Sequence, residues 1–463
     1  MKKFLLYEIV TATGGIVRSQ GGVTSFKGIS TDSRKIKPGE LFLAIKGEKF
    51  DGHAFIPKAI GSGATGIIYS RKENIKQTVL SSQCVIFIEV KDTLEALHNL
   101  AIFYRKKFPI PLIGITGSNG KTSVKEMVDF ILRKKFKTIK NPGNFNNHIG
   151  LPLSLLPLEK KHQIAIMEMG MSRPGEIREL CKIAMPNAGI ITNVGLAHAE
   201  NFKSIKDIAK CKAELVYSLP PRGVAIVNGD DPNLVDAVKN YKGRKIYFGK
   251  EAENEIKAEG IENKGLGINF KLLIGGEKIG VHLHTIGEHN VYNALAASAC
   301  SHYFGVSPEE IKKGLESYKG IHLRMELIKT KRGINILNDT YNANPLSMSK
   351  ALDAFAKIRV SGRKALLLGD MLELGKFAKA SHRGIGSIVG KGPYDLLFTV
   401  GPLAKVIAIE AVKKGMSWDR VRSFTSSGRV LKILKKELMP GDWLLVKGSR
   451  GMKLDEIVNE ITK

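Results

Sequence analysis

Cysteine is scarce in this chain of 463 residues: Cys84, Cys181, Cys211 and Cys300 are scattered, with no C-x-x-C pair and no matching histidine spacing. This pattern supports neither a zinc site nor a disulfide framework, so we expect reduced, buried thiols. Long hydrophobic runs are also missing, because no stretch approaches the roughly 18 uncharged apolar residues of a membrane span. Glu8 interrupts the apolar N-terminal segment, which argues against a secretory signal. We therefore expect a cytoplasmic protein with no membrane span.

Aromatic residues make up only 7% of the chain and do not alternate with basic residues, as a platform for single-stranded nucleic acid requires. Acidic residues are outnumbered, with 44 Asp and Glu against 72 Lys and Arg, which gives a formal net charge of +28. Such a charge attracts polyanions, including nucleic acids and nucleotide phosphates. Because the basic residues are spread along the chain without a long basic tail, we do not expect nucleic acid as a partner.

Short β-branched runs alternate with helical patterns along most of the chain, which is typical of α/β units around parallel sheets. We expect three α/β domains, at residues 1–108, 109–318 and 319–463, the last two doubly wound; prolines at 109 and 111 and Lys319-Gly320 mark the boundaries. The strands are expected at 41–45, 65–69, 112–116, 164–167, 189–193, 224–228, 245–248, 334–337, 365–368, 396–400 and 443–446. Helices are expected at 55–60, 93–107 and 290–304, and antiparallel strands within 251–280.

The strongest motif is the glycine-rich segment from Gly114 to Ser123, GITGSNGKTS, between a predicted strand and an amphipathic helix. Glycines let backbone N–H groups turn toward phosphates, and the following helix N-terminus adds partial positive charge. Lys121 can reach the β- and γ-phosphates and the Thr122 hydroxyl can bind Mg²⁺. The usual motif has a glycine where this chain has Ile115. Even so, the segment indicates an ATP or GTP site rather than a simple connecting turn.

Lys212 lies on the apolar side of a predicted helix over residues 204–219, while Lys206 and Lys210 lie largely on its solvated side. Burial disfavours the charged form of a lysine, and a neutral amine can capture CO₂ as a carbamate that binds metal. The alternative is a lysine that extends its ammonium group to the surface. Periodicity alone favours that alternative.

Three further polar residues follow predicted strands, where doubly wound sheets bind their ligands. Glu168 follows the first of these strands and is either a Mg²⁺ ligand or a carboxylate that begins a helix. His198 and Asp339 also lie beyond strand ends, where His198 by itself is an ordinary loop histidine. Each signal is weak alone, but together they surround the carboxyl edges of two sheets, as a cleft site would.

Seven motifs in order resemble the Mur ligases, ATP-dependent amide-bond-forming enzymes of peptidoglycan precursor synthesis, over essentially the full chain. They are TGSNGKTS at 116–123, EMGMS at 168–172, NVGLAH at 193–198, CKAE at 211–214, GEHNVYN at 287–293, HLRME at 322–326 and ND at 338–339. The family has the shorter glycine pattern, which accounts for Ile115. The resemblance implies an N-terminal UDP-sugar-binding domain, a central P-loop ATPase-like domain and a C-terminal Rossmann-like domain.

Within the family, the segments DTYNANP at 339–345, LGDMLELG at 368–375 and NFNNHIG at 144–150 are similar to those of the members that add D-alanyl-D-alanine to UDP-N-acetylmuramoyl-tripeptide. The signatures expected of the diamino-acid-adding members are absent. The N-terminal segment resembles the part that holds the UDP-sugar, which implies substrate contacts from Ser30, Thr31, Asp32, Ser33 and Arg34.

The resemblance also implies roles for the remaining candidates. ATP is held by Gly117, Ser118, Asn119, Gly120, Lys121, Thr122 and Ser123, with Asn290 and Asn293 toward adenine and Arg324 and Asp339 contacting the nucleotide from the third domain. One Mg²⁺ is bound by Thr122 and Glu168, and a second by His198 and carbamylated Lys212; Lys121, Lys212, His198 and Glu168 are the catalytic groups. The dipeptide is expected near Asn342 and Asn344.

The implied reaction moves the γ-phosphoryl group of ATP onto the tripeptide carboxylate, and the dipeptide amine then attacks the acyl phosphate. Two alternatives stay open: another ligase of the superfamily, such as folylpolyglutamate synthase, and a basic P-loop NTPase that acts on nucleic acid. We expect a monomer. The sequence does not indicate whether the third residue of the tripeptide is L-lysine or meso-diaminopimelate, and the size of the net charge has no explanation in the site.

Overall fold

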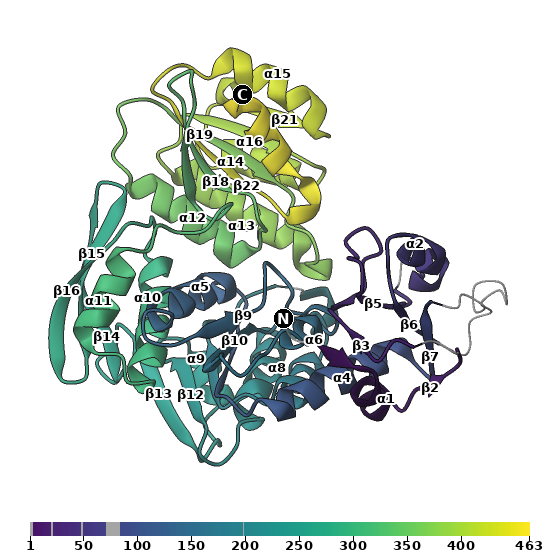
Figure 1. Ribbon diagram of the computed structural model, residues 1–463. Coiled ribbons are helices and arrows are strands. Elements are labelled where there is room, and N and C mark those ends of the chain that lie inside the picture. The colour runs from purple at the N-terminus through teal and green to yellow at the C-terminus, as the bar shows by residue number, and fades with distance from the viewer. Residues whose placement is uncertain (1–2, 20–21, 48–49, 71–83, 198) are drawn as a thin grey trace.

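The computed structural model describes residues 3–19, 22–47, 50–70, 84–197 and 199–463. Figure 1 shows three layered α/β bodies in chain order: the purple N-terminal part at the side, the blue to teal central part, and the green to yellow C-terminal part above the central one. In the described part of the chain, no helix is both long and apolar enough to cross a membrane.

The N-terminal body is built on a sheet with strand order β2-β7-β6-β5-β4, parallel except for the edge strand β2, and on a small antiparallel pair, β1-β3. Its strands are β1 (Phe4–Leu5), β2 (Ile16–Val17), β3 (Ser25–Phe26), β4 (Ile29–Ser30), β5 (Leu41–Leu43), β6 (Gly66–Ser70) and β7 (Ile86–Val90). Its helices are α1 (Leu6–Thr13), η1 (Gly52–Phe55), α2 (Ile56–Gly61) and α4 (Thr93–Lys107). Helix α4 begins where the Asp92 side chain accepts the N–H of Glu95 at 2.8 Å, which satisfies a free donor of the first turn.

The central sheet has the order β16-β15-β14-β13-β12-β11-β8-β10-β9, parallel from β9 to β14 and antiparallel from β14 to β16. Its strands are β8 (Leu112–Thr116), β9 (Thr138–Lys140), β10 (Ile164–Glu168), β11 (Ala188–Ile191), β12 (Val224–Asn228), β13 (Arg244–Gly249), β14 (Ile256–Lys264), β15 (Gly267–Ile274) and β16 (Glu277–Leu283). Its helices are α5 (Lys121–Leu132), α6 (Gly150–Leu155), α7 (Glu176–Ala184), η2 (Ala199–Asn201), α8 (Ile205–Tyr217), α9 (Pro232–Ala237), α10 (His289–Tyr303) and α11 (Pro308–Glu316).

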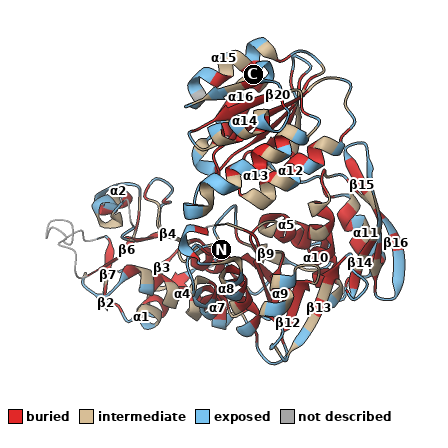
Figure 2. Cartoon of the chain, turned by 180° about the vertical axis from the view of Figure 1, so that it is seen from behind, coloured by how far each residue is buried: buried red, intermediate tan, exposed pale blue. Residues whose placement is uncertain are grey.

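Helices cover both faces of this sheet, because alternate residues of each buried strand point to opposite sides. Ile113 and Ile115 of β8 pack with α5, α10 and α11, whereas Leu112 packs on the other face with α6, α7 and α8. Figure 2 shows the resulting buried strands between layers of half-exposed helices. A parallel sheet buried in this way gathers the ends of its strands at one edge, where the loops are free to form a site.

The C-terminal sheet has the order β17-β18-β22-β19-β20-β21 and is parallel except for β17. Its strands are β17 (Glu326–Lys329), β18 (Asn335–Asp339), β19 (Lys364–Gly369), β20 (Leu396–Val400), β21 (Val421–Phe424) and β22 (Trp443–Lys447). Its helices are α12 (Pro345–Lys357), η3 (Gly375–Phe377), α13 (Ala378–Lys391), α14 (Ala404–Lys413), η4 (Trp418–Arg420), α15 (Ser427–Glu437), η5 (Arg450–Met452) and α16 (Leu454–Thr462). Helices α12, α13 and α14 pack on one face, and α15 and α16 on the other.

The predicted fold class is confirmed: the described chain is α/β, with two doubly wound sheets, and the antiparallel strands expected within 251–280 are found at 256–283. The predicted elements at 93–107, 112–116, 224–228 and 396–400 match the observed limits. The expectation of buried thiols is wrong for Cys84, which is exposed, while the other three cysteines are buried and all four are free. The domain limits 1–108, 109–318 and 319–463 stay predictions.

Candidate active site

The glycine-rich loop connects β8 to α5 and approaches its neighbours too closely for any side chain at two positions. Gly117 has φ +150° and Gly120 has φ +81°. A Cβ on Gly117 would lie 1.8 Å from Thr192 Oγ1, and one on Gly120 would lie 2.4 Å from Asn293 Oδ1. The loop then passes directly into α5, whose first-turn N–H groups have no carbonyl partners within the helix. This is a binding geometry for phosphate.

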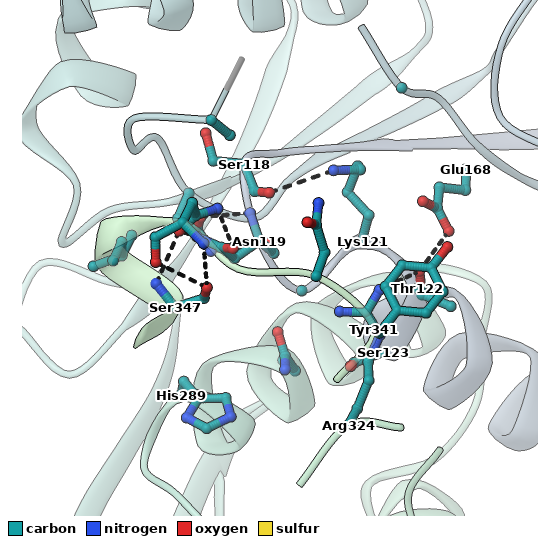
Figure 3. Close-up of a pocket in the computed structure, with 18 of the residues that line it drawn as sticks. Ser118, Asn119, Lys121, Thr122, Ser123, Glu168, His289, Arg324, Tyr341 and Ser347 are labelled. Carbon is teal, nitrogen blue, oxygen red and sulfur yellow. Dashed lines mark hydrogen bonds between the residues drawn. The ribbon is translucent and has the colours of Figure 1, made fainter. Parts of the chain in front are cut away.

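Lys121 is the first residue of α5, and its side chain folds back over the loop. Its Nζ donates to the carbonyl oxygen of Gly117 at 2.8 Å and more weakly to that of Ser118 at 3.4 Å (Figure 3). Burial lowers the pKa of Lys121, and nearby Arg324 lowers it further, whereas the Glu168 carboxylate raises it. The Lys121 amine therefore lies against the loop carbonyls, in a field to which both a carboxylate and a guanidinium group contribute.

Glu168 is the last residue of β10 and only 2% exposed. Its Oε2 accepts the hydroxyl of Thr122 at 2.9 Å, and its Oε1 accepts Nδ2 of Asn146 at 2.8 Å. Both carboxylate oxygens are thus fixed in direction, one from the phosphate loop and one from the turn before α6. Thr122 and Glu168, predicted from different motifs, are direct neighbours.

Lys212 lies on the buried face of α8 with Ile208, Leu215 and Val216 and is 4% exposed. The periodicity-based preference for a lysine that extends to the surface is therefore wrong, because the side chain stays in the interior. Burial lowers its pKa well below the ordinary value, and the charge of Lys121 lowers it further. Among the described residues, no hydrogen bond or ion pair engages its amine. His198, the group predicted to act with it, lies outside the described residues.

Asn290 and Asn293 lie in the first two turns of α10, against the phosphate loop. Nδ2 of Asn293 donates to Oδ1 of Asn290 at 3.0 Å, and Nδ2 of Asn290 donates to the carbonyl of Ile286 at 2.9 Å. His289 precedes them in the same cavity wall, and its Nδ1 is buried without a hydrogen-bond partner among the described residues. Burial lowers the pKa of His289 to about 4, so its ring is neutral near neutral pH.

Arg324 lies in the segment between the central and C-terminal sheets, between two residues with strained backbones. Leu323 has φ +62° and Met325 has φ +50°, values that cost non-glycine residues about 1 kcal/mol or more. The Arg324 guanidinium group stacks 4.2 Å above the Tyr341 ring and donates to Thr122 Oγ1 at 3.2 Å (Figure 3). The strained turn thus places the Arg324 guanidinium group against Thr122 of the phosphate loop.

Three predicted residues at the carboxyl edge of the C-terminal sheet have protein partners. Asp339 forms an ion pair of 2.6 Å with Lys447, which also donates to the carbonyl of Asn342 at 3.0 Å. Asn344 caps α12 by accepting the N–H of Ser347 at 2.9 Å. Its amide group also exchanges hydrogen bonds with that of Asn119 in the phosphate loop.

One cavity of about 1040 Å³ lies between these groups, and its walls come from the phosphate loop, Glu168, the first turn of α10, Arg324 and the end of β18. The structure therefore brings the predicted nucleotide and dipeptide residues together. It does not bring Ser30, Thr31, Asp32, Ser33 or Arg34 into this cavity. These lie at and beyond the end of β4, where Arg34 forms a two-pronged ion pair with Asp32 at 2.9 Å and holds the pKa of that carboxyl at about 2.

The sequence missed several residues that line the site, among them Asn146, His289, Tyr341 and Lys447. Asn146, His289 and Tyr341 stand inside motifs that the sequence singles out, so proximity to a motif could have suggested them. Lys447 directly follows the strand predicted at 443–446 and is the last residue of β22, as Asp339 is the last residue of β18, and that position was the available signal.

Comparison with known proteins gives consistent matches over the chain. Residues 25–105 match the Mur ligase family catalytic domain, residues 115–301 the Mur ligase middle domain and residues 323–450 the Mur ligase glutamate ligase domain. A Bacillus subtilis protein named UDP-N-acetylmuramoyl-tripeptide–D-alanyl-D-alanine ligase is 38% identical over 97% of this chain and 96% of its own length.

Two solved structures are similar over nearly the whole fold. MurF from Acinetobacter baumannii superposes with a TM-score of 0.89 at 31% identity, covering 100% of this chain and 99% of that one. MurF ligase from Thermotoga maritima, solved in complex with ADP, gives 0.82 at 28% identity, covering 94% and 97%. With the phosphate loop, the buried lysine and the cavity between the two sheets, these matches show that the chain belongs to the Mur ligase family.

Proposed function

We propose that the chain is an ATP-dependent ligase that joins D-alanyl-D-alanine to UDP-N-acetylmuramoyl-tripeptide, with UDP-N-acetylmuramoyl-pentapeptide, ADP and phosphate as products. The observation that carries the proposal is the single cavity in which the phosphate loop faces the carboxyl edge of the C-terminal sheet. A ligase needs this arrangement because the nucleotide and the acceptor must meet within bonding distance. The names of the relatives supply the substrates.

The first step is phosphoryl transfer. An oxygen of the tripeptide carboxylate attacks the γ-phosphorus of ATP, and the bond from that phosphorus to the β–γ bridging oxygen breaks, which releases ADP. Lys121 and the N–H groups at the start of α5 stabilise charge on the phosphoryl oxygens, and Arg324 adds a second cation from the C-terminal side.

In the second step the dipeptide amine attacks the carbonyl carbon of the acyl phosphate, and the bond from that carbon to the phosphate oxygen breaks. The amine loses a proton and an amide bond remains. Asn342 and Asn344 at the start of α12 are the proposed dipeptide contacts, although the Asn344 side chain already caps its helix. The walls of the cavity exclude water, which would otherwise hydrolyse the acyl phosphate.

The donor set fits Mg²⁺. Thr122 Oγ1 and Glu168 Oε2 are oxygen ligands 2.9 Å apart at the phosphate loop, and Mg²⁺ is commonly bound by one or two protein oxygens together with substrate phosphates. When bound, Mg²⁺ would withdraw charge from the phosphate oxygens. Glu168 and Thr122 would hold one ion, while His198 and Lys212, as a carbamate, would hold a second.

The carbamate proposal rests on the environment of Lys212. Its amine is buried near Lys121 and its pKa is strongly lowered, which favours the neutral form that reacts with CO₂. The carbon of CO₂ bonds to the nitrogen of the neutral amine, which loses one proton, so a neutral amine becomes an anionic carbamate. That anion would attract the ammonium group of Lys121, whereas a protonated Lys212 would repel it.

The UDP-sugar is assigned to Ser30, Thr31, Asp32, Ser33 and Arg34, with the tripeptide extending toward the phosphate loop. These five residues lie outside the catalytic cavity, so the UDP group would be held away from the reacting carboxylate. A monomer in the cytoplasm stays a prediction.

Phosphate release from ATP tests the proposal. Purified protein, Mg²⁺ and UDP-N-acetylmuramoyl-tripeptide should release phosphate continuously only when D-alanyl-D-alanine is also present. Phosphate release that does not depend on the dipeptide but increases with glutamate plus folate would instead support a folylpolyglutamate synthase. Release that does not depend on the dipeptide but increases with nucleic acid would support a nucleic-acid-dependent NTPase.

A further inference from the structure

Lys125 lies one helical turn after Lys121 on α5 and is completely buried, with 0% exposure. Its Nζ donates to the carbonyl oxygens of Asn141 at 2.9 Å and Gly143 at 3.0 Å. Two carboxylates are close, with Oε1 of Glu126 at 3.5 Å and Oε2 of Glu168 at 3.9 Å. A buried charge is costly unless it is paired and hydrogen-bonded, so these four contacts define its position.

The carbonyls that Lys125 contacts belong to the turn over residues 141–146, and this turn surrounds Glu168. Asn141 is fully buried; its Nδ2 donates to the carbonyl of Glu168 at 3.0 Å, and its Oδ1 accepts the N–H of Glu168 at 3.0 Å. Nδ2 of Asn141 also donates to the carbonyl of Phe145 at 2.8 Å, which closes the turn. At the end of the turn, Asn146 donates to Glu168 Oε1.

Glu168 is therefore held from two sides by one helix. Thr122, in the first turn of α5, donates to Oε2 directly. Lys125, in the same helix, holds the turn that delivers Asn146 to Oε1. Because α5 is buried over most of its length, it fixes the phosphate loop and the direction of the carboxylate together.

We propose that Lys125 is a positioning residue for the ligase: it fixes the turn over residues 141–146, and thereby sets the direction of Glu168 and the affinity of the nucleotide site for a divalent cation. This inference rests on the proposed function in one respect, the assignment of Glu168 as a Mg²⁺ ligand. Lys125 itself does not line the cavity, so it is not placed to contact a substrate.

The alternative is a lysine that only stabilises the fold, and the chain offers a matched example. Lys364 is also buried, at 9% exposure, and donates to the carbonyl of Ala356 at 2.6 Å in the C-terminal body. No contact of Lys364 reaches the cavity within the described chain. Lys125→Met and Lys364→Met therefore both remove a buried ammonium group, but only the first removes one beside Glu168.

The test is calorimetric titration of ADP at increasing Mg²⁺, which requires no ligation. In Lys125→Met we expect the Mg²⁺ concentration for half-maximal enhancement of ADP binding to rise at least about tenfold, in the range seen when metal-site supports are removed. ADP binding without Mg²⁺ should change by less than about twofold, because the loop amides are intact. Lys125→Arg should recover most of the Mg²⁺ response, and Lys364→Met should lower the melting temperature while leaving that response unchanged.

A Lys125→Met protein with the wild-type Mg²⁺ response would overturn the inference. If this variant does not fold, Asn146→Ala tests the last link of the same chain of contacts, and an unchanged Mg²⁺ response there has the same meaning. Wild-type protein that binds ADP independently of Mg²⁺ would also overturn it. A wild type that binds MgADP but fails to ligate the proposed substrates would remove the proposed function and leave the role of Lys125 standing.

Discussion

The side-chain amides of Asn119 and Asn344 exchange hydrogen bonds across the cavity: Nδ2 of Asn344 donates to Oδ1 of Asn119 at 2.8 Å, and Nδ2 of Asn119 donates to Oδ1 of Asn344 at 3.3 Å. Asn119 belongs to the phosphate loop and Asn344 caps α12, so this pair joins the central and C-terminal bodies at the site itself. Arg324 and Thr122 form a second direct link between the same regions.

Asn344→Ser should separate the two roles of Asn344. Serine can still cap α12, so we expect less than about 0.5 kcal/mol of stability to be lost, while the KM for ATP should rise roughly five- to tenfold, about 1–1.4 kcal/mol for two lost hydrogen bonds. Steady-state kinetics and urea unfolding measure both effects. Ser307→Ala, which removes the cap of α11 outside the site, is the matched control and should lower stability by about 1 kcal/mol with the KM unchanged. An unchanged KM in Asn344→Ser would show that the amide pair does not influence nucleotide binding.

Lys212→Ala should abolish ligation while ADP binding and the fold are retained, because the variant lacks the amine that would form the proposed carbamate. A small added carboxylic acid should partly restore turnover by supplying the missing oxygens. Phosphate-release assays with and without the acid are the measurement. Lys210→Ala, on the exposed side of α8, should behave as wild type. Full activity of Lys212→Ala without a supplement would exclude the carbamate role.

Replacing Lys121 with alanine should reduce turnover about 100- to 1000-fold, the usual cost of losing one preorganised group that stabilises transition-state charge. Binding of UDP-N-acetylmuramoyl-tripeptide should persist, because its UDP group is assigned to the N-terminal body. Turnover and substrate binding are measured separately, the latter by calorimetry. Unchanged turnover would indicate that Lys121 serves only to hold the loop through Gly117 and Ser118.

The free energy of unfolding should decrease as the pH is lowered into the acid range, partly because of His289. Burial lowers its pKa to about 4, below the ordinary 6.5 of the unfolded chain. Between these values the unfolded state binds more protons, so the free energy of unfolding falls as the pH falls, by up to about 1.4 kcal/mol per pH unit. Above the unfolded value His289 contributes no pH dependence.

Urea unfolding of wild type and His289→Asn, near pH 7 and near about pH 5, isolates this effect from that of other groups. The wild type should lose roughly 2 kcal/mol more than the variant between these conditions. His284→Asn, at an exposed position, should reproduce the wild-type pH dependence. Equal losses in wild type and His289→Asn would show that His289 does not stay neutral in the folded protein.

Local sequence patterns determined the elements of this protein. Helix α4 matches its predicted limits because Asp92 caps its start and Pro109 follows its end. The phosphate loop could be recognised from the sequence because glycines 117 and 120 stand where the backbone approaches Thr192 and Asn293 too closely for a side chain. Helical spacing also placed Lys212 with the apolar residues of α8. It could not show whether the long side chain turns back to the surface, because that depends on what covers the helix.

The sequence by itself thus indicated the α/β class, most of the strands and a set of candidate residues that largely line one cavity, since periodicity, capping and glycine geometry act over a few neighbouring residues. Only the tertiary structure decided how these residues are joined. Asn119 and Asn344 are 225 positions apart, and Arg324 lies 202 positions from Thr122, so no local pattern encodes either contact. Lys125 is one turn from the phosphate loop, yet its partners come from another segment. Such contacts are set by how the buried faces of the sheets and helices pack, and packing is a property of the whole chain.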